Sequence, residues 1–215
     1  MIALLKKDVF VMDKQMRVLV LLALLFNLIP SASSLGATYA MMIALMLPMS
    51  TISYDERCKW DRYVAMLPWT PRQIVGSKYV LSYTTMVLGA ALIVLGNFAR
   101  TLYSEGADWG ETGALIAMYL VLIGLITAVT YPLLYRFGSE KGRLLLVAIF
   151  AAMFILAFGA VVLAIDDMEG VVGRLKAVPA PALAAAAVIV LAGANFLSYR
   201  LSVKIYLRRR DGRYA

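Results

Sequence analysis

Long apolar runs without a charged residue alternate with short polar segments along this chain. Four runs have 21 to 24 residues, the length of an α-helix that crosses a hydrocarbon layer about 30 Å thick. They are Tyr79–Ala99, Thr112–Tyr135, Leu144–Ile165 and Ala177–Tyr199. A further uncharged run, Val18–Tyr54, is too long for one span at about 1.5 Å per residue. Its segment NLIPSASSLG, at 27–36, predicts a turn within that run.

The pattern predicts an all-α, polytopic membrane protein. We expect six transmembrane helices, near 17–34, 37–53, 74–99, 112–135, 144–165 and 177–200. The first two spans are shorter than usual, so a partly re-entrant arrangement of these two stays open. Hydrophobic residues make up 62% of the 215 positions, and six passes leave no room for a soluble catalytic domain. Residues 1–215 should therefore form a single membrane domain.

Residues 1–16 predict a helix that lies in the membrane interface. Apolar side chains recur there at helical spacing, with charged side chains around the other face. The apolar positions are Ile2, Leu5, Val9, Met12 and Met16. An ordinary cytoplasmic extension of the first span would show the same pattern. We exclude a cleavable signal peptide, because no small-residue cleavage site follows the first apolar run closely.

The polar segment 54–73, called the foot below, predicts a short amphipathic helix over 55–67, between the second and third spans. The apolar residues on one face of that helix are Trp60, Tyr63, Val64 and Leu67. Asp55, Lys59 and Arg62 take the opposite face, and Arg57 can pair with Asp61 one turn on. Two interpretations are open. The helix either lies on lipid or forms a rigid element that receives force from a soluble partner.

The second part of the foot predicts a sharp corner. Pro68 ends the amphipathic helix, and Thr70 can cap the next helix with Pro71 at its first position. Gln73 completes a Thr-x-x-Gln capping box, and Trp69 precedes the cap where a hydrophobic staple would close. The foot should therefore end at a fixed angle to the third span.

Lysine and arginine are distributed unevenly between the connections. The net charge is +8, and of the 21 basic residues all but Arg100, Arg174 and Lys176 lie on one set of alternating connections. These connections are the N-terminal segment, the foot, 136–143 and the C-terminal tail. The positive-inside rule therefore places both termini and the foot in the cytoplasm. The basic tail suits anionic lipid, and we expect no nucleic-acid partner.

The chain lacks the residues for several kinds of chemistry. It has no histidine, one cysteine (Cys58), and no G-x-x-x-x-G-K-[ST] phosphate loop. The motifs of zinc metalloproteases and serine hydrolases are absent as well. The interiors of the predicted spans hold no Asp, Glu, Lys or Arg, which counts against ion-coupled carriers and channels. We therefore expect no catalytic residue, metal site or cofactor in this chain.

Polar and methionine side chains of the first helical hairpin are candidates for lining a substrate pathway. The residues are Asn27, Tyr39, Met42, Met46, Met49 and Ser50. Because methionine adapts to varied apolar shapes, such a lining would suit an amphipathic or hydrophobic molecule. The alternative interpretation is that these side chains only pack helix against helix.

The run YDERCKWDRYVAMLPWTPRQIVGSKY at 54–79 resembles the loop between the second and third helices of ABC-2 type transporter permeases. More narrowly, it is similar to the small six-span bacterial subfamily that includes the phenol-soluble modulin exporter permeases. The residues that carry the resemblance are Asp55 or Glu56, Trp60-Asp61, Leu67-Pro68, Arg72, Ile74-Val75 and Lys78-Tyr79.

This resemblance implies a permease of the bacterial plasma membrane that docks a separate ATP-binding cassette ATPase, which holds ATP and Mg²⁺. A second permease chain, identical or different, would complete the transporter. The N-terminal helix would be the interfacial connecting helix, and the foot would be the coupling helix. The implied docking residues are Asp55, Glu56, Arg57, Lys59, Trp60, Asp61, Arg62, Tyr63 and Leu67. The implied rigid corner comprises Pro68, Trp69, Thr70, Pro71 and Gln73.

On this resemblance we expect the permease subunit of an exporter that moves an amphipathic or hydrophobic substrate outward, such as a peptide, a drug or a lipid. The chain itself would not be an enzyme, because the partner would hydrolyse the ATP. The alternative is a membrane anchor or regulatory subunit that docks a cytoplasmic partner and has no transport pathway of its own.

Overall fold

The computed structural model describes residues 2–27, 33–64, 66–103, 109–163 and 180–210. Its helices are α1 (Ile2–Asn27), α2 (Ser33–Arg57), α3 (Trp60–Val64), α4 (Pro71–Tyr103), α5 (Trp109–Leu163) and α7 (Ala180–Arg210). These described residues contain no strand, so the predicted all-α class is confirmed.

Three stretches of the described helices are long and apolar enough to cross a membrane: Pro71–Ala99, Thr112–Ile155 and Ala185–Arg209. They support a multi-pass helical membrane protein. The longest stretch contains the predicted span 112–135 and half of the predicted span 144–165. Half of the turn predicted within 27–36 falls on 28–32, which lie outside the described residues. The division into six spans therefore stays a prediction.

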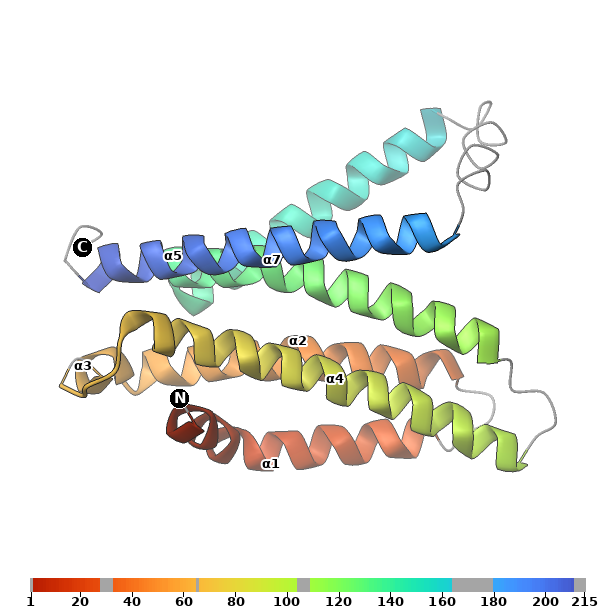
Figure 1. Cartoon of the computed structure of the whole chain (residues 1–215), viewed down its shortest axis with the longest axis horizontal. Helices are drawn as coiled ribbons and strands as arrows, with labels where there is room; N and C mark the ends of the chain where they lie inside the picture. Colours follow the sequence, from red (N-terminus) through yellow and green to blue (C-terminus); the bar gives the residue numbers. More distant parts are fainter. Residues whose placement is uncertain (1, 28–32, 65, 104–108, 164–179, 211–215) are drawn as a thin grey trace.

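Helix α5 consists of two helices that meet at Gly138. The backbone there has φ 81° and ψ 173°, a conformation that residues with a Cβ adopt only under strain. In Figure 1, the part of α5 before this kink runs toward one end of the molecule, and the part after it runs back away from that end. This reversal lies within the predicted connection 136–143.

The long helices run back and forth, so features far apart in sequence lie at one end of the molecule. Figure 1 shows the start of α1, the short α3, the reversal in α5 and the end of α7 at this end, called the foot end below. These are the segments that the charge distribution placed on one side of the membrane. Of the other connections between predicted spans, 100–111 falls in part on 104–108, and 166–176 falls wholly on 164–179, ranges that lie outside the described residues.

Two predicted elements have other bounds in the structure. The helix predicted over 1–16 continues into the following span as one α1, because no proline, glycine or turn sequence separates them. This continuity agrees with the open alternative of a helical extension of the first span. The first turns of α1 are set at an angle to the remainder in Figure 1. The single helix predicted over 55–67 is divided between the end of α2 and the short α3. The break lies at Cys58 and Lys59, where Lys59 has a positive φ of 51°.

Helix α7 is also longer than the predicted span, which ended near residue 200. Its additional turns stay helical because they pack at the foot end, where Val203 and Tyr206 are buried in the same apolar cluster as Leu4 of α1 and Ile52 of α2. The basic end of α7 is thereby held against the foot.

The centre of the molecule is occupied by α2, which contacts α1, α4 and α5. Five of its described side chains are at most 1% exposed: Ala40, Ile43, Ala44, Leu47 and Thr51. The two alanines allow neighbouring helices to approach closely, which is how small residues favour helix association in membranes. The foot is therefore the direct extension of the central helix α2.

Candidate functional site

Four charged side chains from three helices form a network at the base of the foot. The Nζ atom of Lys78 lies 2.8 Å from Asp8 Oδ1 and 2.6 Å from Asp55 Oδ2. The Nζ atom of Lys7 lies 3.0 Å from Asp8 Oδ1 and 2.6 Å from Asp55 Oδ1. Two positive and two negative charges balance, so the network joins α1, α2 and α4 without a net buried charge.

This network is mostly shielded from solvent, since Asp8 is only 1% exposed and Lys78 only 5%. The pattern over 1–16 predicts charged side chains around the face opposite the apolar one, and for Asp8 this prediction is wrong. The spacing along the helix indicates the burial of Asp8, because Asp8 lies four residues from both Leu4 and Met12, which are also buried. Lys78 likewise follows the buried Ile74 by one turn. A charge on the apolar face of a helix indicates a buried partner.

Trp60, the first residue of α3, lies against this network. The Nζ atom of Lys7 is 4.2 Å from the centre of the Trp60 ring, a cation–π geometry. The ring centres of Trp60 and Trp69 are 6.5 Å apart, and both tryptophans pack against the apolar cluster at the foot end. Trp60 therefore holds the foot to its own protein, and the sequence pattern alone did not show this.

Glu56 joins the end of α2 to the reversal in α5 and to α7. Its Oε2 accepts a hydrogen bond of 2.7 Å from the backbone N–H of Ser139, the first residue after Gly138. Its Oε1 lies 3.3 Å from Nη1 of Arg209. A carboxylate at the N-terminus of a helix satisfies a free N–H group and interacts favourably with the helix dipole. Glu56 thus caps the second part of α5.

A stack of tyrosines joins α4, α5 and α7 next to the foot. Tyr79 and Tyr131 stack with ring centres 4.5 Å apart, and Tyr135 continues the stack at 6.5 Å from Tyr131. Tyr206 meets Tyr135 edge to face at 5.9 Å. The hydroxyl of Tyr131 donates to the backbone carbonyl of Lys78 at 2.9 Å. These rings fill the space between α4, α5 and α7 with stiff side chains.

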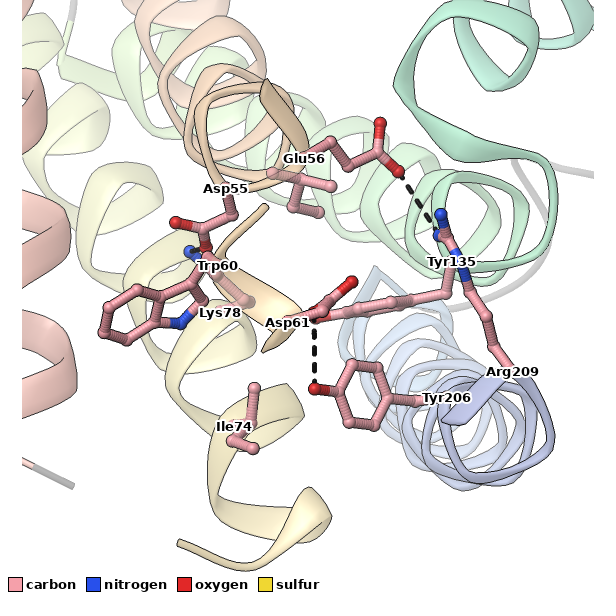
Figure 2. A pocket seen from close by; sticks show the side chains of 10 residues that line it. Asp55, Glu56, Trp60, Asp61, Ile74, Lys78, Tyr135, Tyr206 and Arg209 are labelled. Atoms are coloured by element: carbon pink, nitrogen blue, oxygen red, sulfur yellow. Dashed lines mark hydrogen bonds and ion pairs between the residues drawn. The ribbon is translucent and has the colours of Figure 1, made fainter. Parts of the chain in front are cut away.

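Figure 2 shows a small pocket between these groups, with Asp55, Trp60 and Lys78 on one side and Tyr206 and Arg209 of α7 on the other. Its volume of about 30 Å³ is far below the several hundred Å³ of a typical ligand pocket. It is therefore too small to receive a substrate.

The Asp61 carboxylate accepts a hydrogen bond of 3.3 Å from the Tyr206 hydroxyl (Figure 2). Partial burial of this carboxylate raises the pKa of Asp61 above its usual value, against the opposing effect of the nearby Arg209 guanidinium. Asp61 therefore faces its own chain with one oxygen, although the residue as a whole is exposed.

The corner has the hydrogen bonds that the Thr-x-x-Gln pattern predicts. The backbone N–H of Gln73 donates to Thr70 Oγ1 at 3.4 Å, and the backbone N–H of Thr70 donates to Gln73 Oε1 at 3.1 Å. Pro71 is the first residue of α4. Trp69 and Ile74 belong to the same apolar cluster on either side of the cap.

The tip of the foot presents apolar side chains to the outside. Tyr63 is 62% exposed, Met66 84% and Leu67 40%. Val64, predicted on the same helical face, is buried at 3%. The charged residues around the exposed tip are Arg57, Lys59, Asp61 and Arg62, all exposed. The structure thus divides the predicted docking residues into an exposed set and a set (Asp55, Glu56 and Trp60) that holds the foot in place. Met66 was missed.

The candidate pathway residues divide in the same way. Met42 and Met46 are exposed at 40% and 48%, whereas Tyr39, Met49 and Ser50 are half-buried. The side chain of Asn27 lies outside the described part of the chain. Among the described residues, no group of three or more acidic or cysteine side chains is placed to hold a metal ion.

A family model described as an ABC-2 family transporter protein matches residues 3–207, which run from the first turn of α1 into the last turns of α7. No curated protein and no solved structure matches the chain.

Proposed function

The chain belongs to the ABC-2 family of transporter proteins and is a membrane permease of an ABC transporter. From this premise we propose that it is the permease subunit of an exporter, which moves an amphipathic or hydrophobic substrate outward with energy from a separate ATPase. ATP and Mg²⁺ would be held by that ATPase, and this chain would supply the membrane path.

The observation that carries the proposal is the construction of the foot. Its tip exposes Tyr63, Met66 and Leu67 within a charged rim, while its base is fixed to the bundle. Interface anchors are typically aromatic and large apolar residues surrounded by polar groups. We propose that this tip enters a groove on the ATPase and that Trp60 keeps the tip in position.

The contacts of the foot suggest how movement would pass into the membrane. The charge network ties it to α1 and α4, and Glu56 ties it to α5 and α7. A shift of the foot would therefore act on four helices together. Energy would enter only through a difference in the affinity of the ATPase for two positions of the foot.

The remaining parts of the proposal concern the assembly. We propose six spans, with 54–73 as the cytoplasmic coupling segment and both termini in the cytoplasm, on the distribution of lysine and arginine. A second permease chain would pair with this one, in the plasma membrane of a bacterium.

The test uses the purified chain in vesicles with the cassette ATPase that co-purifies with it, identified by mass spectrometry. Replacing Tyr63 and Met66 together by alanine should weaken ATPase binding at least about tenfold, because interface anchors commonly contribute 2 kcal/mol or more. ATP-driven uptake of a fluorescent amphipathic peptide into inside-out vesicles should fall with it. The matched control replaces Val188 and Ile189, exposed apolar residues of α7 away from the foot end.

Unchanged ATPase affinity in the Tyr63→Ala/Met66→Ala variant would refute the docking role of the tip. A wild-type chain that binds the ATPase yet transports nothing would favour the membrane-anchor alternative.

A further inference from the structure

An open groove of about 690 Å³ lies at the foot end between α1, α2 and the second part of α5. Three cationic side chains line it: Lys14 from α1, Arg57 from α2 and Arg143 from α5. Val11, Val18 and Leu19 of α1 form an apolar wall. The volume falls in the range of pockets that hold small molecules, and far exceeds that of the pocket under the foot.

The groove is cationic without an acidic side chain in its lining. The nearest carboxylates in sequence are already paired elsewhere: Asp13 with Arg17, Asp55 with two lysines, and Glu56 with Arg209. Among the described residues, Lys14 and Arg57 take part in no ion pair. The positive charge of the groove is therefore not neutralised by the protein, which favours an anionic ligand.

Two hydrogen bonds build the polar side of the groove. Arg143 donates through Nη2 to Ser53 Oγ at 3.0 Å, and Gln15 donates through Nε2 to Ser50 Oγ at 3.4 Å. They fix α5 and α1 to the same face of α2. Arginine retains further N–H donors after one such bond, and its planar fork suits phosphate and carboxylate.

An apolar stripe on α2 continues from the groove toward the middle of the molecule. Met46 and Met42 precede Ser50 at intervals of four residues, so the three side chains share one helical face. Both methionines are exposed. Methionine accommodates flexible chains of varied shape, so the stripe offers a path for an apolar tail whose head lies in the groove.

We propose that this groove binds the anionic head, a phosphate or a carboxylate, of an amphipathic substrate before transport. The head would contact Lys14, Arg57 and Arg143, and the tail would lie along the apolar wall of α1 toward Met46 and Met42. The inference rests on the proposed exporter function and narrows its substrate class to anionic amphiphiles.

Binding is measured on the full chain in maltoside detergent, without the ATPase, by native mass spectrometry with dodecyl phosphate as the probe. Dodecyltrimethylammonium has the same tail with the opposite charge, and inorganic phosphate has no tail. We expect dodecyl phosphate to bind most tightly of the three. Arg57→Gln/Arg143→Gln should weaken its binding at least about tenfold, because a hydrogen bond to a charged group contributes more than 1.4 kcal/mol.

The matched control is Lys141→Gln/Lys204→Gln, which removes two exposed cations at the foot end outside the groove and should change the affinity less than about twofold. Lys14→Gln is a second test, because the Lys14 side chain is exposed and its replacement breaks no ion pair of the described residues, and it should also weaken binding. Equal affinity in the groove variants and the control would overturn the proposal. So would binding of dodecyltrimethylammonium as tight as that of dodecyl phosphate.

A lipid source is distinguished in vesicles that contain phosphatidylglycerol. Retention of this lipid by the wild type, lost in Arg57→Gln/Arg143→Gln and not displaced by dodecyl phosphate, would make the groove a lipid site and overturn the substrate proposal. Because the ATPase is absent, a negative binding result leaves the permease proposal standing. Conversely, intact binding with no ATP-driven transport would refute the exporter alone.

Discussion

At the scale of single residues, the most consequential contacts join charges that sequence spacing does not bring together. Lys7 and Asp55 are 48 positions apart, and Asp8 and Lys78 are 70 apart. The capping box at Thr70 and Gln73 is the opposite case, because both partners lie within one helical turn. The sequence could therefore predict the cap, and only the packing of α1 against α2 and α4 reveals the charge network.

Replacing Asp8 by asparagine should destabilise the folded protein by about 3–5 kcal/mol, because it leaves two buried or half-buried lysines with one carboxylate. The matched control is Asp13→Asn on the same helix. That substitution breaks an exposed pair with Arg17, and should cost less than about 1 kcal/mol. Thermal unfolding of the detergent-purified variants measures the difference. Equal loss in both would mean that the network contributes no more than a surface ion pair.

At the scale of elements, the foot and the reversal in α5 are one structural unit. Glu56 caps the helix that begins after Gly138, and this contact was not predicted because its partners come from segments 83 positions apart. Contacts between distant segments also explain why the helix predicted over 55–67 is divided. Asp55 and Glu56 belong to α2, and side chains or backbone of other helices hold them there, so α2 continues to Arg57 and ends at that residue.

Gly138→Ala should destabilise the protein by about 1–3 kcal/mol, because alanine is strained at a φ of 81°. The added Cβ would also lie 3.3 Å from Glu56 Oε1. Gly113→Ala, on the same helix with no atom within 4 Å of the added Cβ, is the control. It should be neutral or stabilising by up to about 1 kcal/mol. Chemical unfolding compares the two variants, and a neutral Gly138→Ala would contradict the glycine requirement.

At the scale of the whole molecule, the start of α1, the end of α7, the foot and the reversal in α5 share one end (Figure 1). Hydrophobic run lengths and the alternation of lysine and arginine predicted this grouping before any contact was known. Both properties are sums over many residues, so they tolerate errors of several residues in each boundary.

The single cysteine offers a direct test of which side of the membrane this end faces. Cys58 is free and exposed in the turn between α2 and α3. We expect a membrane-impermeant maleimide to label it only after intact cells are permeabilised, because the positive-inside rule places the foot in the cytoplasm. In Cys58→Ser/Thr101→Cys, the exposed position at the far end of α4 should react without permeabilisation. Labelling of Cys58 in intact cells would reverse the proposed orientation.

The sequence by itself determined the helical class, the membrane location, the corner at Pro68–Gln73 and the family, because these follow from run length, charge placement and contacts within one turn. The tertiary structure decided that Trp60 faces its own chain, that Asp8 and Lys78 are buried partners, and that Glu56 caps α5. It also decided that a cationic groove forms between α1, α2 and α5. The hydrogen bonds among these contacts join residues that are 35 to 153 positions apart. Their pairing depends on the rotation and depth of each packed helix, which the sequence pattern of a single helix does not specify.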